Sequence, residues 1–267
     1  MPFTPAHAAA AFPFRRTGLI WSALVIGTMA PDIEYFLRLA PGQPYGHTPP
    51  GIFLVSLPLG LITLWLFHSF VKAPFVELLP RELECRLVPY MRKFQFGGAS
   101  RFALIAASVL IGIFTHIAWD SFTHKNSPLV HAWPPLRYPV NLGPLGACPL
   151  YKLLQYGSSV FGLAVLAVAI VAWYRQAEPC DIEPNCSHRG WPMRRILTLL
   201  AISAIALVAG FGYAIWTEGM PSRRPSLSLF VAPLVITAMA AAWWQLVLLG
   251  IIRVARSRLR KSAAKVS

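Results

Sequence analysis

Residues 101–124 read RFALIAASVLIGIFTHIAWDSFTH, an apolar stretch that leads directly into a group of polar side chains. Between Phe102 and Trp119 the stretch contains no Lys, Arg, Asp or Glu. A run of about 20 apolar helical residues spans a bilayer core of about 30 Å. We therefore expect Phe102–Trp119 to form a transmembrane helix.

Five other segments share this apolar character. Four of them are long enough to span a bilayer: Gly51–Val71, Tyr156–Tyr174, Ile196–Trp216 and Leu229–Ile252. The fifth, Thr17–Ala30, is stopped by Pro31 and reaches only roughly 20 Å by helical rise. We expect an all-α polytopic membrane protein with about six transmembrane helices. Residues 75–94, FVELLPRELECRLVPYMRKF, predict an additional interfacial helix broken by prolines.

The composition of the chain indicates the same class of protein. Of its 267 residues, 56% are hydrophobic and 13% are charged, and the mean hydropathy is +0.55. This balance is typical of proteins whose partner is the lipid bilayer. The net charge of +14 would also suit nucleic acid, but the basic residues are separated by apolar runs and form no motif that reads bases. We therefore exclude nucleic acid as a partner.

Lys and Arg are distributed unequally on the two sides of the six predicted spans. One side carries 18 of them and the other carries 6. Because basic residues favour the cytoplasmic side, the count predicts that both termini face the cytoplasm. We expect residues 1–252 to form a single transmembrane domain and residues 253–267 a basic cytoplasmic tail.

The polar group at the end of the central stretch points to chemistry. His116, Asp120 and His124 are spaced four residues apart, so on a helix they stay within about 80° of one face. Helical rise from Arg101 places Asp120 at about 28 Å, in the outer part of the bilayer. Titratable groups at membrane depth are costly and usually functional.

Asp32 arrives at a similar depth from a different segment, about 24 Å above Arg16 by helical rise. A metal site needs carboxylates and imidazoles that tertiary structure brings together, and matched depth is its precondition. His47 follows on the next short loop. We predict a site for a divalent metal, specifically zinc, with these ligands: Asp32, His47, His116, Asp120 and His124, with His7 as a further candidate.

The sequence leaves two features of this site undecided. His7 reaches the cluster if the N-terminal segment re-enters the membrane, and it does not if the N-terminus is an ordinary cytoplasmic one. His116 and His124 are about 12 Å apart along a helix, too far to bind one ion unless the helix unwinds. A pair of ions about 4 Å apart, bridged by Asp120 or Asp32, is the alternative.

Five stretches of this sequence closely resemble a bacterial family known as domain of unknown function 4184. They are MPFTPAHAAAAFPFRR (1–16), ALVIGTMAPDIEYFLRL (23–39), GHTPPGIFLVSLPLGL (46–61), GIFTHIAWDSFTH (112–124) and PLYKLLQYGSSVFGL (149–163). The resemblance covers roughly the first 165 residues, whereas the last two spans match only in being hydrophobic. It implies no established activity.

A more distant resemblance is to bacterial inner-membrane proteins classed as metal-dependent hydrolases. They place an early His, a Pro-Asp turn, a His followed by Ser or Thr, and a later His-x-x-x-Asp on their helices. The matching positions here are His7, Asp32, His47 with Thr48, and His116 with Asp120. This sequence lacks the Arg that often follows the His in that group, which bears on the substrate more than on metal binding.

These observations favour a metal-dependent hydrolase of the inner membrane, acting on a phospholipid or lipid-linked phosphate at the outer face. In this reading Glu34 is the general base that activates a water, and Asp120 is the second catalytic residue. A transporter with a transient ion site is the first alternative, although Ile105–Gly112 and Leu57–Leu66 are nearly all apolar. A membrane scaffold with a purely structural cluster is the second alternative.

Overall fold

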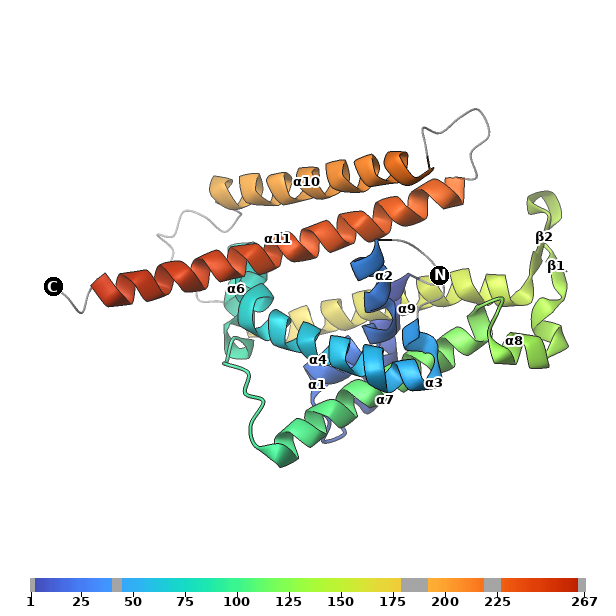
Figure 1. The fold of residues 1–267 in the computed structure, drawn as a ribbon, viewed down its shortest axis with the longest axis horizontal. Coiled ribbons are helices and arrows are strands. Elements are labelled where there is room, and N and C mark those ends of the chain that lie inside the picture. The colour runs from blue at the N-terminus through green and yellow to red at the C-terminus, as the bar shows by residue number, and fades with distance from the viewer. Residues whose placement is uncertain (1–2, 40–44, 179–191, 219–226, 264–267) are drawn as a thin grey trace. The chain divides into compact units, whose positions relative to one another are not determined.

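A computed structural model describes residues 3–39, 45–178, 192–218 and 227–263 of the chain, and most of them are helical (Figure 1). The chain divides into two compact units. Unit 1 comprises Met1–Glu34, Pro44–Leu64 and Phe96–Gln176, and unit 2 comprises Tyr35–Gln43, Trp65–Gln95 and Ala177–Ser267. The candidate ligands of the metal site all belong to unit 1.

Five helical stretches are long and apolar enough to cross a membrane, which confirms the all-α polytopic fold. They are Pro49–Glu77, Ala99–Ala132, Leu150–Gln176, Met193–Thr217 and Phe230–Ser262. Each contains one of the spans predicted from its apolar run, except that the last stretch begins one residue after Leu229, the predicted start. The first contains two π-helical turns, Ile52–Ser56 and Phe67–Val71.

The segment Thr17–Ala30, predicted as a shorter sixth span, does not form a spanning helix. It contains only α1, Trp21–Gly27, whose 7 residues rise about 10 Å. A 3-10 turn at Ala30–Asp32 follows, and Pro31 in this turn has no amide hydrogen to donate to a helix. α2, Ile33–Arg38, begins directly after the turn. This part of the prediction is corrected from a span to a short helix.

The centre of unit 1 is the pairing of α1 with α7, Ala99–Thr123, which cross in Figure 1. Glycines allow this close approach, because a Cβ atom at Gly27 would collide with the backbone of Val109 and one at Gly112 would collide with the backbone of α1. Small residues at helix interfaces are typical of membrane proteins. The amide of Ile20 also donates a hydrogen bond of 3.0 Å to Ser108 Oγ on α7.

Two further elements complete the body of unit 1. The 3-10 helix Thr4–Phe14 packs against α9, Leu150–Gln176, where a Cβ at Gly162 would lie 2.6 Å from Ala6 O. The short helix α3, Pro49–Gly51, leads through a π-helical turn into α4, Leu57–Leu66. In α4, Gly60 lies against Val109 of α7.

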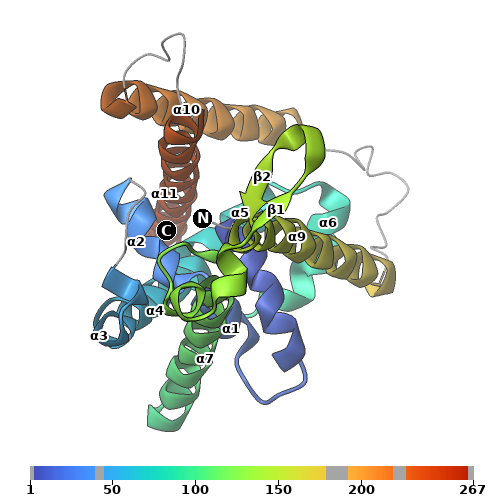
Figure 2. The ribbon, with the colours of Figure 1, turned by 90° about the vertical axis from the view of Figure 1, so that its right-hand side faces the viewer.

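The Pro-rich segment between α7 and α9 contains short regular elements. These are α8, Pro128–Ala132, the 3-10 turns Pro134–Arg137 and Gly143–Leu145, and the strands β1, Pro139–Asn141, and β2, Ala147–Pro149. The two strands pair antiparallel, with Val140 opposite Cys148, and form the hairpin seen in Figure 2.

In unit 2, α10, Met193–Glu218, pairs with α11, Leu227–Ala263. The basic tail predicted from residue 253 begins as a continuation of α11. The predicted interfacial segment forms α5, Lys72–Glu77, α6, Arg81–Leu87, and a 3-10 turn, Val88–Tyr90. Glu84 of α6 pairs with Arg195 of α10 at 2.6 Å.

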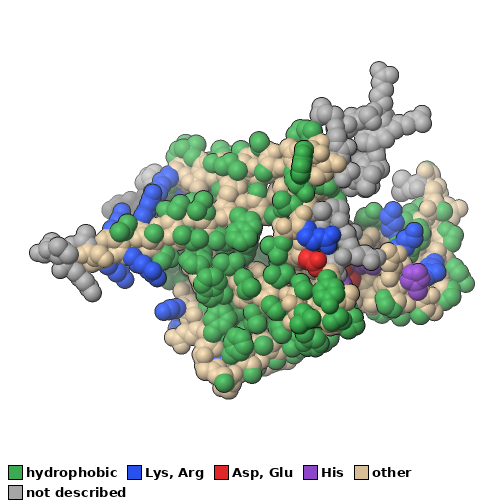
Figure 3. Space-filling view, in the orientation of Figure 1, with side chains coloured by type: hydrophobic (Ala, Val, Ile, Leu, Met, Phe, Trp, Pro, Cys, Tyr) green, Lys and Arg blue, Asp and Glu red, His purple; other side chains and the backbone are tan. Residues whose placement is uncertain are grey.

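The surface of the molecule agrees with a membrane environment. Hydrophobic side chains cover most of the face shown in Figure 3, and Lys and Arg gather toward the C-terminal end of α11. Large apolar side chains on the spans are exposed, among them Leu54, Val160, Val168 and Val208, each 69% or more exposed. Such side chains are stable against lipid and costly against water.

Candidate metal centre

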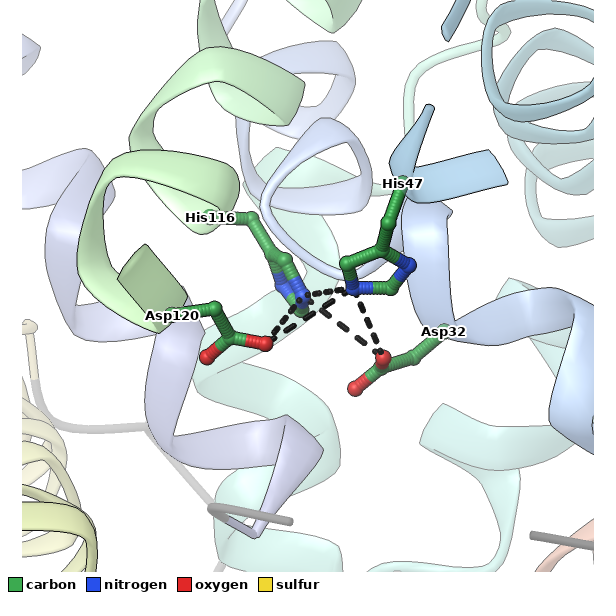
Figure 4. A group of neighbouring side chains, drawn as sticks. All are labelled: Asp32, His47, His116 and Asp120. Carbon is green, nitrogen blue, oxygen red and sulfur yellow. Dashed lines mark hydrogen bonds and ion pairs between the residues drawn. The ribbon is translucent and has the colours of Figure 1, made fainter. Parts of the chain in front are cut away.

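Four side chains from three separate parts of unit 1 converge on one point (Figure 4). Asp32 comes from the turn before α2, His47 from the 3-10 turn Tyr45–His47, and His116 and Asp120 from α7. One ligand atom of each lies within 4.8 Å of all the others. The side chains of Asp32, His116 and Asp120 are 3%, 0% and 9% exposed, whereas that of His47 is 24% exposed.

The distances between these atoms have the size of the edges of a metal coordination tetrahedron. His116 Nε2 lies 3.2 Å from His47 Nε2, 3.3 Å from Asp120 Oδ2 and 3.6 Å from Asp32 Oδ1. His47 Nε2 lies 3.7 Å from each carboxylate. Zinc bonds of about 2.0–2.2 Å give tetrahedral edges of about 3.3–3.6 Å. The residues present therefore fit a divalent metal ion.

His116 and Asp32 are each oriented by a second contact on the side away from the cluster. His116 Nδ1 lies 2.8 Å from the carbonyl oxygen of Thr28, so Nδ1 carries the proton and Nε2 presents its lone pair to the cluster. Thr4 Oγ1 donates a hydrogen bond of 2.6 Å to Asp32 Oδ2, leaving Oδ1 toward the cluster. Neither threonine could be predicted from the sequence, because their roles depend on tertiary contacts.

The loop carrying His47 is fixed through the peptide groups of the preceding residue, Gly46. The Gly46 amide donates to Glu34 Oε2 at 3.1 Å, and its carbonyl accepts from Ser56 Oγ at 2.9 Å. A Cβ atom at position 46 would lie 2.5 Å from Ser56 Oγ. Glu34 is thus placed beside the His47 loop, and it is not among the four converging residues.

His7 lies next to the cluster. This is the position expected if the N-terminal segment re-enters the membrane. Its ring stacks on His116 with a centroid distance of 4.0 Å and meets Trp119 edge-on at 5.4 Å. His7 Nε2 is 3.3 Å from Asp120 Oδ1, and the His7 side chain is 1% exposed.

His124 reaches Asp120 because α7 ends just before it. The residue has extended backbone angles, φ −108° and ψ 130°, which release its side chain from helical spacing. Its Nδ1 lies 3.4 Å from Asp120 Oδ2 and 3.2 Å from the Asp120 carbonyl oxygen. His124 is therefore in contact with one ligand but is outside the four-residue group, and its side chain is 30% exposed.

Acidic side chains are unusually concentrated at the cluster for a unit that is otherwise apolar. Unit 1 contains three carboxylate side chains in its sequence, Asp32, Glu34 and Asp120. Two of them belong to the cluster and the third holds the loop of a cluster residue. Carboxylates in such surroundings need compensation by hydrogen bonds or by a cation.

The helices and the cluster together define a polytopic membrane protein with a buried Asp/His group able to hold a metal ion. The chain belongs to the family described as Domain of unknown function (DUF4184), whose model matches residues 1–251. The match extends through the last two spans, beyond the first 165 residues that carry the recognisable motifs. No curated protein and no solved structure matches the chain.

Proposed function

We propose that this protein is a membrane-bound metal-dependent hydrolase whose ion is held by Asp32, His47, His116 and Asp120. The observation that carries the proposal is the convergence of these four ligand atoms at separations of 3.2–3.7 Å, apart from the pair of carboxylates, in the interior of unit 1. The set of two imidazoles and two carboxylates suits zinc among the common divalent ions.

The residues of the chain have separate roles in the proposed reaction. A bound divalent ion would lower the pKa of a coordinated water and polarise the group to be cleaved. His116, locked by Thr28, and Asp32, locked by Thr4, hold their ligand atoms in place. His47 is the most exposed of the four, so substrate approaches from its side. The catalytic roles predicted for Glu34 and Asp120 stay part of the proposal.

The substrate class follows from where the cluster lies in the chain. His116 is 17 residues into α7, about 26 Å along a helix that spans the bilayer. A phosphoester at the level of the lipid headgroups would reach this depth, so we propose a phospholipid or a lipid-linked phosphate. Lys125, which is exposed and directly follows His124, supplies a cation for the phosphate.

The proposed orientation keeps the C-terminus in the cytoplasm of the inner membrane, as the unequal Lys and Arg count indicates. For the N-terminus, the proposal differs from the prediction that both termini face the cytoplasm. Thr4–Phe14 descends from the level of His7 and α1 returns to the level of Thr28, so the two form a hairpin with Arg15 and Arg16 at its tip. In this arrangement Arg15 and Arg16 face inward and the N-terminus lies on the side of the site.

A structural metal site is the second candidate function, and one observation favours it. Four protein ligands complete a tetrahedral ion, whereas catalytic zinc sites usually have three and leave one position to water. A conduction pathway has less support, because the buried residues of α7 below His116 are Ile105, Ser108, Val109, Gly112 and Ile113, none of them charged.

Metal content and turnover together test the proposal. We expect detergent-purified protein to contain stoichiometric zinc, and Asp32→Ala and Asp120→Ala to lose it while remaining monodisperse. His131→Ala is the matched control, since His131 lies in unit 1 on α8 and contacts Arg137 instead of the cluster. Release of phosphate or of a phosphorylated headgroup from lipid vesicles that requires both carboxylates would support the hydrolase. Bound metal without any phosphoester turnover would favour the structural site.

A further inference from the structure

One edge of the cluster has polar atoms that the four-residue group does not use. Both ring nitrogens of His7 and the Oδ1 atom of Asp120 are buried, and none of them makes a hydrogen bond within the described part of the chain. His7 Nε2 and Asp120 Oδ1 lie 3.3 Å apart. They are within ion-pair distance of each other, and they share no hydrogen bond in this structure.

Buried polar atoms without partners are rare in folded proteins, and each needs an explanation. Here two of them, a nitrogen and a carboxylate oxygen, face each other inside an apolar unit. Their separation of 3.3 Å equals the edge that two ligands of one tetrahedral ion form at bond lengths of about 2 Å. Both atoms are of ligand type, and neutral imidazole and carboxylate are common metal ligands.

The other oxygen of the same carboxylate already belongs to the four-residue cluster. Asp120 Oδ2 lies 3.3 Å from His116 Nε2 and 3.7 Å from His47 Nε2. A carboxylate that offers one oxygen to each of two ions is the usual bridge of two-metal hydrolytic sites, where the ions are about 3.5–4 Å apart.

We infer that His7 Nε2 and Asp120 Oδ1 form a second divalent-metal position, so that Asp120 bridges two ions. The inference rests on the proposed function and deepens it. The four-residue cluster completes the coordination of the first ion, and the second ion has two protein ligands in the described residues. Water and a phosphate oxygen would have to complete its coordination, which is the arrangement that phosphoester hydrolysis on two metal ions requires.

The second position depends on the N-terminal segment. His7 is held by the packing of Thr4–Phe14 on α9, by its stacking on His116, and by a hydrogen bond of 3.1 Å from the Phe3 amide to Ser159 Oγ. The second ion would therefore connect this segment to α7 through its bonds to His7 and Asp120.

Manganese provides the probe, because two nearby Mn²⁺ ions give an exchange-coupled EPR spectrum that one isolated ion does not. The full-length protein in detergent would be stripped of metal, titrated with Mn²⁺, and measured by equilibrium dialysis and EPR. We expect about two Mn²⁺ per chain and a coupled signal. A single Mn²⁺ per chain at saturation, with an uncoupled spectrum, would overturn the second position.

Two variants of His7 locate the position. His7→Ala removes the ligand, and His7→Phe removes it while keeping an aromatic ring against His116. We expect both to bind about one Mn²⁺ and to lose the coupled signal, whereas His131→Ala keeps two ions. If either folded His7 variant still binds two coupled ions, the assignment to His7 is wrong.

The same data separate this inference from the proposed function. One ion per wild-type chain together with turnover of a lipid phosphoester would reject the second position and retain the hydrolase. Two coupled ions without turnover of any lipid phosphoester would retain the second position and reject the hydrolase. Loss of metal only in Asp32→Ala or His116→Ala, and not in His7→Phe, would confine binding to the four-residue cluster.

Discussion

His116 Nδ1 donates its proton to the carbonyl oxygen of Thr28 at 2.8 Å, and this bond joins the end of α1 to α7 at the level of the metal centre. α1 ends at Gly27, so the carbonyl of Thr28 is free of helical hydrogen bonding and available to the imidazole. The contact both completes the helix end and selects the tautomer that presents Nε2 to the cluster.

His116→Ala is expected to lower stability as well as metal content. The substitution leaves a cavity at a fully buried position and removes the partner of Thr28 O, which together cost on the order of 2–4 kcal/mol. His124→Ala is the control, since its side chain is 30% exposed and outside the four-residue group. Thermal unfolding in detergent and zinc content check both variants. Equal effects of the two substitutions would contradict the placement of His116 at the centre.

Glu34→Gln tests whether Glu34 acts as a base or holds the His47 loop. A glutamine can still accept the hydrogen bond from the Gly46 amide, so we expect zinc affinity to be retained, whereas loss of the proposed general base should abolish turnover. Glu34→Ala removes the acceptor, and we expect zinc affinity to fall by about 10- to 100-fold, as for other residues that orient a ligand. Full zinc binding with retained turnover in Glu34→Gln would show that Glu34 holds the His47 loop and does not act as the general base.

Gly27→Ala tests the close packing of α1 on α7. The added Cβ would meet the backbone of Val109, and such overpacking costs about 1–3 kcal/mol. Because Thr28 directly follows, we also expect weaker zinc binding. Gly157→Ala on α9 is the matched control, since a Cβ there meets nothing within 4 Å. An unchanged unfolding temperature in Gly27→Ala would argue against the α1–α7 interface.

Single-cysteine variants test the proposed orientation. Cys148 on β2 is a free, partly exposed thiol, and we expect a membrane-impermeant maleimide to label it in intact cells. Cys85 on α6 is disulfide-bonded, which is typical of an oxidising compartment, whereas the proposed orientation, based on the 18-to-6 excess of basic residues, has α6 in the cytoplasm. With Cys85 as the single cysteine, we expect labelling only after the membrane is permeabilised. Labelling of Cys85 in intact cells would reverse the orientation.

The sequence predicted the parts of this structure that depend on local pattern. The apolar run before His116 and the four-residue spacing to Asp120 together predicted α7 and the face that carries its two ligands. Matched depth predicted the meeting with Asp32, and the short loop after it predicted the approach of His47. The prediction of α7 follows from helical rise and the thickness of the bilayer, whereas the depth count for Asp32 assumed a continuous helix from Arg16 that the structure does not contain.

The remaining parts depend on contacts between distant residues. The return of His7 to the cluster needs the packing of Thr4–Phe14 on α9, and no periodicity in the sequence indicates it. The shortness of α1 follows from Pro31 together with the hydrogen bond from Ile20 to Ser108. The hydrogen bond from the Gly46 amide to Glu34 could not be predicted from the sequence either, and the role of Glu34 as a base stays a prediction.

Every carboxylate side chain of unit 1 lies at a single place, and this has a consequence for the assembly of the protein in the membrane. If Asp32 and Asp120 were both ionised before the cluster forms, their mutual repulsion would oppose the approach of the turn after α1 to α7. Uptake of the cation would remove this repulsion and fix the final assembly. Cells starved of the ion would then accumulate an immature form that membrane proteases degrade, and the abundance of the protein would follow the metal supply.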